Sequence, residues 1–353
     1  MMKRRTFQWG LVAGLCGLMD THAAMSSPIQ SLDRIKRLRI GQGPLADGFS
    51  VAPGGWLNWY FVNLGLIAIV QYLQPDDLDH YIRRYLDLYL SRLEPDATIR
   101  DVQFADATMQ NMVLVPSDSD DSYAATLLSL ALRYLQASGN RAWWLDNQSR
   151  LRTLAEANIV SQTKPNGLCR VFQLQRSSLV SEHAFTMNNC EDYRGLRDFS
   201  VLLQLQGHSA EATHYKRHAH RLGLSIARHL WDRDSGGYRV SDQDQRADPH
   251  SFYPGMACQV FPQAMGVLEC SPHHGAAYRF LNSRARHWPL GVDDPFAWCI
   301  LGHVAALRGD TRRARQQLVT TEALYGQQPE RVTINELGFD LRIRSLLNGR
   351  PEI

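Results

Sequence analysis

Two clusters of acidic residues are the groups in this sequence best suited to acid–base chemistry. The first is Asp118, Asp120 and Asp121, and the second is the adjacent pair Glu191 and Asp192. A helix N-cap needs only one Asp, Asn or Ser, so each cluster exceeds the requirement for capping. Crowded carboxylates repel each other, which raises the pKa of at least one of them. The clusters are therefore open to two interpretations, helix capping or a functional site.

Carboxylates on opposite sides of a cleft are suited to the cleavage of glycosidic bonds. One carboxyl group, protonated, acts as general acid on the leaving oxygen, and the other activates water or attacks the sugar. We expect Asp121 or Asp120 to be one catalytic carboxylate and Glu191 the other. Asp118 and Asp192 would then tune the pKa of their neighbours or bind sugar hydroxyls. This chemistry requires no metal ion and no other cofactor.

Aromatic and basic residues near the two clusters are candidates for binding a carbohydrate substrate. Tyr123 and Tyr193 each directly follow an acidic cluster, and Arg194 is suited to orienting a carboxylate or binding an acidic sugar. Burial in the core is the alternative for each aromatic ring. Asp294 precedes Pro295, so capping of a helix that begins there is the alternative for this residue. The remaining predicted substrate-binding residues are Trp56, Tyr253, Asp294 and Trp298.

The helices expected to position these residues are of two kinds. One kind is apolar on nearly all sides and must be surrounded by protein, whereas the other kind is amphipathic and lies on the outside. The expected inner helices are residues 56–73, 122–135, 192–205, 255–268, 295–307 and 335–347. The expected outer helices are residues 77–93, 141–158, 211–231, 273–286 and 312–325, and residues 32–40 are expected to pair with the last inner helix.

The alternation of the two kinds predicts an all-α fold, an (α/α)6 toroid in which an outer ring of helices surrounds an inner ring. All inner helices would run in one direction, which gathers their N-termini and the acidic clusters at one mouth. The alternative is an α-solenoid, whose repeats have a fixed period of roughly 34–45 residues. The spacings here vary, and residues 96–115 and 164–187 are long insertions. Their strand-like stretches, residues 112–115 and 170–174, predict short β-hairpins at one mouth.

The N-terminal residues 1–24 have the pattern of a signal peptide. Basic residues 3–5 precede an apolar run over residues 9–19, and Ala23-Ala24 offers a cleavage site. Arg4 and Arg5 resemble the core of a twin-arginine signal, and a general secretory signal is the alternative. The sequence thus predicts a periplasmic or secreted protein whose residues 25–353 form a single domain.

The composition excludes some classes of function. The formal net charge is only +3 and the basic residues are interleaved with acids, which argues against nucleic acid as a partner. Residues 56–73 are long enough to span a membrane. Asn58, Asn63 and Gln71 interrupt them, so we expect a buried helix and no stable membrane span after signal cleavage. After removal of residues 1–24 five cysteines remain, an odd number that leaves at least one unpaired within a monomer. The sequence indicates no particular oligomeric state.

The stretch S-D-S-D-D-S-Y-A-A-T-L-L-S-L-A-L-R-Y over residues 117–134 resembles the entry to an inner helix in the six-hairpin glycosidase superfamily. It is also distantly similar to the Asp-rich helix entry of glycoside hydrolase family 8. The sequence has no match to that family's Ser-Glu-Gly-type segment, which carries the general acid. Residues 191–198, E-D-Y-R-G-L-R-D, resemble a hairpin entry of uncharacterised six-hairpin proteins. The resemblance implies an (α/α)6 toroid and an exported glycoside hydrolase-like enzyme that acts on a poly- or oligosaccharide.

Two other functions remain open on the same fold. A polysaccharide lyase would need a Tyr or His base and a group that neutralises a uronic acid. Tyr193, Arg194, Asn188 and Asn189 supply these types of residue. The other alternative is a non-catalytic sugar-binding component of an exopolysaccharide system, since a toroid does not by itself imply catalysis.

Overall fold

The computed structural model describes residues 28–104, 111–173 and 182–350. The predicted signal peptide lies outside these residues. Helices dominate the described chain, which also contains two small antiparallel sheets.

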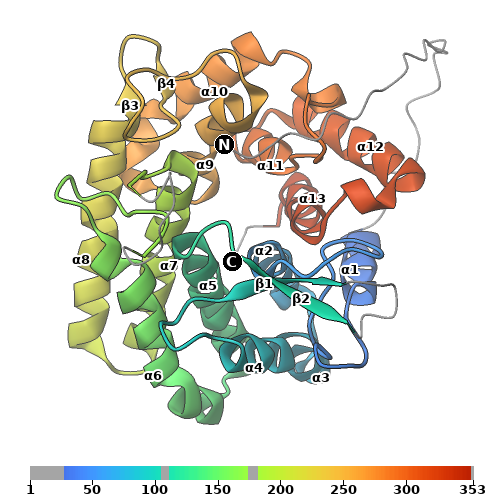
Figure 1. Cartoon of the computed structure of the whole chain (residues 1–353). Helices are drawn as coiled ribbons and strands as arrows, with labels where there is room; N and C mark the ends of the chain where they lie inside the picture. The colour runs from blue at the N-terminus through green and yellow to red at the C-terminus, as the bar shows by residue number, and fades with distance from the viewer. Residues whose placement is uncertain (1–27, 105–110, 174–181, 351–353) are drawn as a thin grey trace.

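Six helical segments form a closed inner ring around a central axis, which Figure 1 views end on. Each segment packs against the next one along the chain, and the last packs against the first. The inner segments are α2 (Trp59–Ile69), α5 (Asp121–Ser138), α7 (Thr186–Leu205), α9 (Phe261–Ala264) with the turns before it, α11 (Ile300–Leu307) and α13 (Ile334–Leu347).

A second set of helices surrounds this ring and completes an (α/α)6 toroid, as the alternation of helix types predicts. Ser31 on the first outer helix donates a hydrogen bond to Asp340 on α13 over 2.6 Å, so the predicted closure of the ring is confirmed. The outer helices are α1 (Pro28–Arg37), α3 (Pro75–Asp77) continuing through a π-helical stretch (Leu78–Arg83) into α4 (Arg84–Ser91), α6 (Arg141–Asn158), α8 (Ser209–Ser225) with its π-helical extension (Ile226–Leu230), α10 (His274–Arg284) and α12 (Thr311–Gln327).

The hairpin between α5 and α6 shows how local sequence sets this pattern. The sequence of α5 is rich in Ala and Leu, and most of its residues are buried. Gly139 ends the helix in the left-handed conformation (φ 63°), which glycine adopts without a steric penalty. Asn140 then caps α6, its side chain accepting a hydrogen bond from the backbone N–H of Trp143 over 3.0 Å. A buried helix is thus followed at once by an outer one.

The fourth inner segment is not the continuous helix that residues 255–268 predict. It consists of a π-helical turn (Phe252–Met256), a 3-10 turn (Ala257–Val260) and the short α9. Pro254 and Pro262 lack a backbone N–H and cannot continue the hydrogen-bond ladder of an α-helix. Gly266, with φ of 67°, ends the segment.

The prediction of a helix from Pro295 is also wrong, because α11 begins only at Ile300. Trp298 has a positive φ of 54°, which no α-helix accommodates. Asp294 therefore does not cap this helix. Its carboxylate instead accepts hydrogen bonds from the backbone N–H of Phe296 (3.0 Å) and the indole N–H of Trp298 (2.8 Å), which holds a tight loop.

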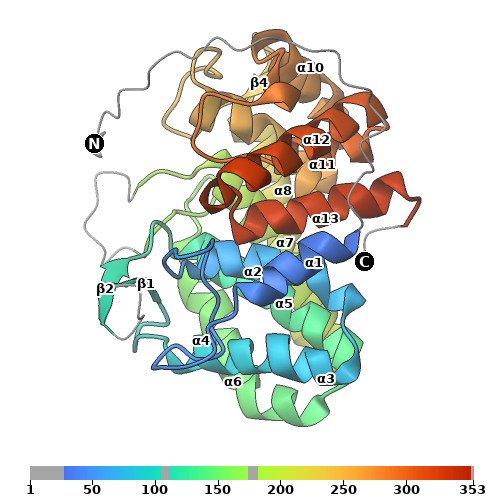
Figure 2. The same ribbon diagram turned by 90° about the vertical axis from the view of Figure 1, so that its right-hand side faces the viewer.

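A β-hairpin lies beside the mouth at which the inner helices begin. Strands β1 (Arg100–Phe104) and β2 (Met112–Pro116) pair antiparallel, which confirms the strand predicted at residues 112–115. Leu57, just before α2, pairs with Val102 of β1, and Figure 2 shows the hairpin at one end of the toroid. Residues 170–173 form no strand, so that part of the prediction is wrong. A second short pair joins β3 (Trp231–Asp232) and β4 (Gly237–Tyr238).

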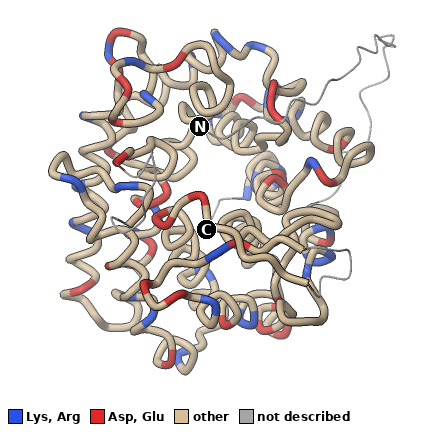
Figure 3. Tube along the Cα trace, viewed as in Figure 1, with Lys and Arg blue, Asp and Glu red and all other residues tan. Residues whose placement is uncertain are grey.

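The described chain also bears on the expectations about membranes, charge and thiols. None of its helices combines the length and the apolar character that crossing a membrane requires. Helix α2 is instead buried in the ring, as expected. Basic and acidic residues are intermixed along the trace (Figure 3), in agreement with the small net charge. The five cysteines of residues 25–353 are all buried free thiols.

Candidate active site at the mouth of the toroid

Side chains from the first turns of three inner helices meet at one end of the ring. Tyr60, in the first turn of α2, donates a hydrogen bond from its hydroxyl to Glu191 on α7. Asn188 of α7 donates to the carboxylate of Asp121, the first residue of α5, over 3.0 Å. The inner helices therefore begin at the same mouth, and both predicted acidic clusters lie there.

Glu191 is a buried acid within the second turn of α7, which begins at Thr186 rather than at the predicted residue 192. Its side chain is only 3% exposed. Burial raises the pKa of Glu191 to about 8; the hydrogen bond from Tyr60 opposes this shift and the nearby negative charge of Asp118 adds to it. At neutral pH about ten Glu191 carboxyl groups are therefore protonated for each one that is ionised.

Asp118 is the exposed carboxylate of this mouth. Its negative charge contributes to raising the pKa of Glu191 and the pKa values of the hydroxyls of Tyr60, Tyr123 and Tyr253. Asp118 thus lies among the groups that surround the buried acid, within reach of solvent.

An aromatic surface borders these two acids. Tyr253 is 52% exposed, and its ring centroid lies 5.2 Å from that of Trp298. Tyr60 stacks against Tyr123 at 5.9 Å. The exposed ring of Tyr253 is suited to stacking on the apolar face of a sugar. Trp56, also among the predicted binding residues, is half-buried in the loop before α2.

Tyr123 and Tyr193 do not present their rings to solvent. Tyr123 is 2% exposed and donates a hydrogen bond to Asp101 of β1 over 2.6 Å. Tyr193 is 1% exposed, and its hydroxyl accepts a hydrogen bond from the backbone N–H of Leu268. Arg194 donates from its Nε to Asp198, one turn further along α7, over 2.8 Å. A direct contact between any of the three and substrate at this mouth stays a prediction.

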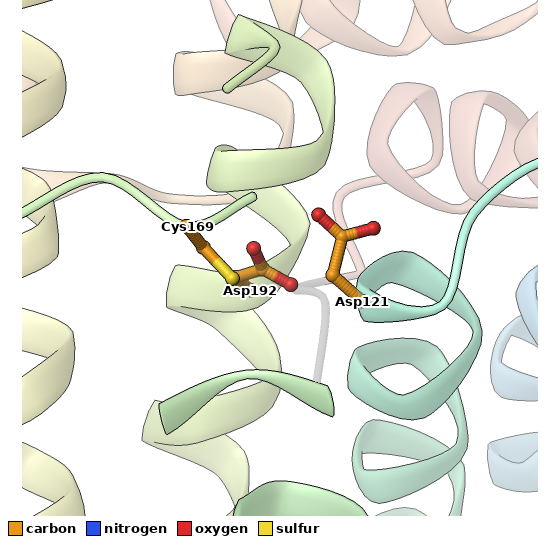
Figure 4. A group of neighbouring side chains, drawn as sticks. All are labelled: Asp121, Cys169 and Asp192. Atoms are coloured by element: carbon orange, nitrogen blue, oxygen red, sulfur yellow. The ribbon is translucent and has the colours of Figure 1, made fainter. Parts of the chain in front are cut away.

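Asp120 and Asp121 are buried at this end of the ring. The carboxylate of Asp120 is buried and accepts a hydrogen bond from the backbone N–H of Gln173 over 3.0 Å, which ties the 164–173 loop to α5. The side chains of Asp121, Asp192 and Cys169 gather between α5 and α7 (Figure 4). All three are fully buried. Burial raises the pKa of Asp121, and the charges of Glu191 and Asp120 add to this shift. Burial, together with the charge of Asp121, raises the pKa of Asp192.

This trio has the atom types of a metal site, with all three ligand atoms within 4.8 Å of one another. The Sγ of Cys169, however, also lies 3.4 Å from the carbonyl oxygens of Ile159 and Arg170, which fits a thiol that donates its proton. Burial raises the pKa of this thiol. Oδ2 of Asp121 and both carboxylate oxygens of Asp192 are buried without a hydrogen-bond partner among the described residues. Shared protons or a bound cation would satisfy these oxygens.

Sequence reasoning missed two polar groups that shape the mouth. Tyr60 is the hydrogen-bond donor to Glu191. Asp101 accepts hydrogen bonds from the hydroxyl of Tyr123 and from the side-chain amide of Asn58. Burial raises the pKa of Asp101 to about 7. The sequence did offer a signal for Tyr60, because a tyrosine hydroxyl in an apolar, buried helix usually has a hydrogen-bond partner in the protein.

Comparisons with solved structures show which proteins share this fold. No protein-family model matches the chain, and no curated protein matches it. The chain superimposes on a rhamnosidase from Klebsiella oxytoca with rhamnose bound (TM-score 0.64, 14% identity, 94% of this chain and 66% of that chain). It also resembles a GH63 mannosylglycerate hydrolase from Thermus thermophilus in complex with glucose (TM-score 0.55, 14% identity, 92% of this chain and 100% of that chain). A sugar epimerase from a ruminal bacterium has a similar fold (TM-score 0.54, 12% identity, 91% of this chain and 96% of that chain).

These neighbours confirm that the chain has the (α/α)6 toroid fold of the six-hairpin glycosidases. The chain spans two thirds or less of the rhamnosidases that it matches. Hydrolases and an epimerase share the fold, so the reaction has to be argued from the residues of the site.

Proposed function

We propose that this protein is an exported glycoside hydrolase-like enzyme in which Glu191 is the general acid and Asp118 the second carboxylate. The observation that carries the proposal is the state of Glu191, a buried carboxyl group whose pKa is raised to about 8 at the mouth of the toroid. A general acid must hold its proton at the working pH, and burial is a common means of achieving this.

The two acids divide the chemistry between them. Glu191 donates its proton to the oxygen of the leaving sugar as the glycosidic bond breaks. The hydroxyl of Tyr60 orients the carboxyl group and stabilises the carboxylate that forms, because a hydrogen bond to a charged acceptor is stronger than one to a neutral acceptor. The exposed carboxylate of Asp118 activates water or attacks the sugar from the other side.

The surroundings of the acids support a carbohydrate substrate. Tyr253 and Trp298 offer neighbouring ring faces at the mouth, and Asp294 fixes the indole of Trp298. Of the similar structures, the Klebsiella enzyme holds rhamnose and the Thermus enzyme holds glucose. A poly- or oligosaccharide is therefore the substrate class that we propose.

Export belongs to the same proposal and rests on the sequence of residues 1–24. Cleavage near Ala23-Ala24 would release residues 25–353 into the periplasm or the medium. N-terminal sequencing of protein recovered outside the cytoplasm tests it. A chain that keeps residues 1–24 and stays in the cytoplasm would refute it.

The activity is tested by incubating residues 25–353 with a panel of neutral and uronic polysaccharides. Reducing ends without unsaturated products, lost in Glu191→Gln and Asp118→Asn, are the expected result. Asp293→Asn, which changes an exposed acid of the loop before α11, is the matched control and should retain activity.

The other outcomes identify the competing functions. Unsaturated products would indicate a lyase, and their loss in Tyr193→Phe but not in Glu191→Gln would assign the base to Tyr193. Sugar binding without turnover would indicate a non-catalytic component. Activity that survives Asp118→Asn and is lost in Asp121→Asn would assign the second carboxylate to Asp121 instead.

A further inference from the structure

The lumen of the inner ring contains a cavity of about 190 Å³ that begins below Glu191. Two helices contribute polar side chains at positions i, i+3 and i+7, the spacing that places residues on one face of a helix. These lining residues are Thr126, Ser129 and Arg133 on α5, and Glu191, Arg194 and Asp198 on α7. An apolar part of the lining comes from Leu64, Ile67 and Ala68 on α2.

The cavity opens at the end of the ring opposite to the candidate active site. Gln71, which follows the end of α2, and Gln136 and Ala137, in the last turn of α5, line the cavity and are exposed to solvent. The inner helices end at this mouth, just as they begin at the other one.

Three arginines from three different inner helices line this second opening: Arg133, Arg194 and Arg342. Asp198 lies between two of them, 2.8 Å from Nε of Arg194 and 3.7 Å from Nη2 of Arg133. The guanidinium of Arg342 lies 5.2 Å from the ring centroid of Phe339.

All three arginines have further partners in the protein. Each guanidinium nevertheless carries five N–H donors in a planar fork, so it can contact a neighbour and a ligand at once. Three cations and one carboxylate, counted over the described lining residues at this end, also give the opening a positive potential.

We propose that this second mouth is a binding site for a small oxyanion, a carboxylate or a phosphate carried by a molecule no larger than one sugar unit. The arginines would hold the oxyanion, since guanidinium groups match both carboxylate and phosphate geometry. The body of the ligand would lie in the lumen against the apolar part of the lining from α2. A volume of about 190 Å³ is below the roughly 300–1,000 Å³ of pockets for larger ligands, which sets the size limit.

The site shares its cavity with the proposed catalytic acid, because Glu191 lines the inner end. Arg133 and Arg342 belong to other helices than Glu191, and Arg194 follows Glu191 by about one turn of α7. Asp118 is not among the described lining residues, so anion binding by Asp118→Asn is a readout independent of the proposed hydrolase activity.

The test is isothermal titration of residues 25–353 at low salt with inorganic phosphate, glucuronate and glucose. We expect saturable binding of phosphate, of glucuronate or of both, and none of glucose. A response to phosphate alone or to glucuronate alone identifies which source of the oxyanion the site accepts. Arg342→Gln should weaken binding at least tenfold, because charge-assisted hydrogen bonds to the ligand are lost.

Two matched variants make the result decisive. Arg312→Gln changes an exposed arginine on α12 and should bind as the wild type does. Asp118→Asn, which changes the other proposed catalytic carboxylate, should also bind, because Asp118 is not among the described residues that line the cavity. The proposal is overturned if neither anion binds saturably, if Arg342→Gln binds as tightly as Arg312→Gln, or if Asp118→Asn rather than Arg342→Gln abolishes binding. A circular-dichroism melt of each variant establishes that it is folded.

Discussion

The protonated state of Glu191 predicts how the stability of the protein depends on pH. The pKa of this group rises from its ordinary 4.5 to about 8 in the folded protein. The folded state therefore binds the proton more tightly than the unfolded state. The resulting stabilisation is fully present below pH 4.5 and is lost as the pH rises towards 8.

Glu191→Gln removes this dependence, because glutamine has a similar shape and does not ionise. At 1.36 kcal/mol per pKa unit, a difference of about 3.5 units corresponds to roughly 5 kcal/mol between low and high pH. We expect the free energy of unfolding of the variant, relative to the wild type, to be about 3 kcal/mol higher at pH 7 than at pH 4. Above pH 8 this difference should reach roughly 5 kcal/mol.

Urea unfolding of residues 25–353 from pH 4 to pH 9, wild type against variant, measures this difference. Asp293→Asn, which removes an exposed carboxylate, serves as the control and should give a difference that hardly changes with pH. A Glu191→Gln difference that is equally flat between pH 5 and pH 8 would refute the reasoning. Glu191 would then titrate as an ordinary carboxyl group and could not be a general acid at neutral pH.

Three further outcomes are expected. Tyr60→Phe removes the hydrogen bond that favours the ionised form of Glu191, so the basic limb of the pH–rate profile should move to higher pH by up to about one unit, and an unchanged limb would argue against this contact. Gly195→Ala places a methyl group 2.6 Å from Cα of Ala125 where α7 crosses α5, and we expect a loss of about 1–3 kcal/mol or more in urea unfolding. Gly326→Ala, on α12 with no atom within 4 Å of the new methyl group, should instead be neutral or stabilise by up to about 1 kcal/mol, and equal effects of the two alanines would contradict the packing of α5 on α7.

The toroid was predictable because buried helices and surface helices differ in their pattern of apolar and polar residues. α5 is apolar over most of its surface, apart from the stripe of Thr126, Ser129 and Arg133, whereas α6, directly after it, alternates apolar and charged residues. The exceptions have local causes. Proline breaks the fourth inner segment, and the positive φ of Trp298 delays the start of α11. Hydrophobicity alone does not reveal either, because both segments are as apolar as a buried helix.

The candidate site was predictable only in part, because the direction of a side chain depends on where a helix begins. Successive residues of an α-helix point about 100° apart, so an error of one residue in the start of α5 moves Asp120 or Asp121 from the mouth into the protein. Glu191 was singled out from the excess of acids at its position, and its catalytic role stays a prediction. Asp118, three residues before α5 begins, is the exposed member of its cluster. Tyr60 comes from a distant segment, and its contact with Glu191 depends on the closed ring.

The central claim, that Glu191 protonates the leaving group and Asp118 acts on the sugar, is tested most directly by varying the leaving group. Aryl glycosides of an acidic phenol need little help from a general acid, whereas alkyl glycosides depend on it. On the sugar that the panel identifies, we expect Glu191→Gln to lose roughly 100-fold or more in kcat/KM with the alkyl glycoside and to retain most of it with the aryl glycoside. Asp118→Asn should lose activity with both. Equal losses of Glu191→Gln on the two substrates, or full activity of Asp118→Asn, would contradict the account.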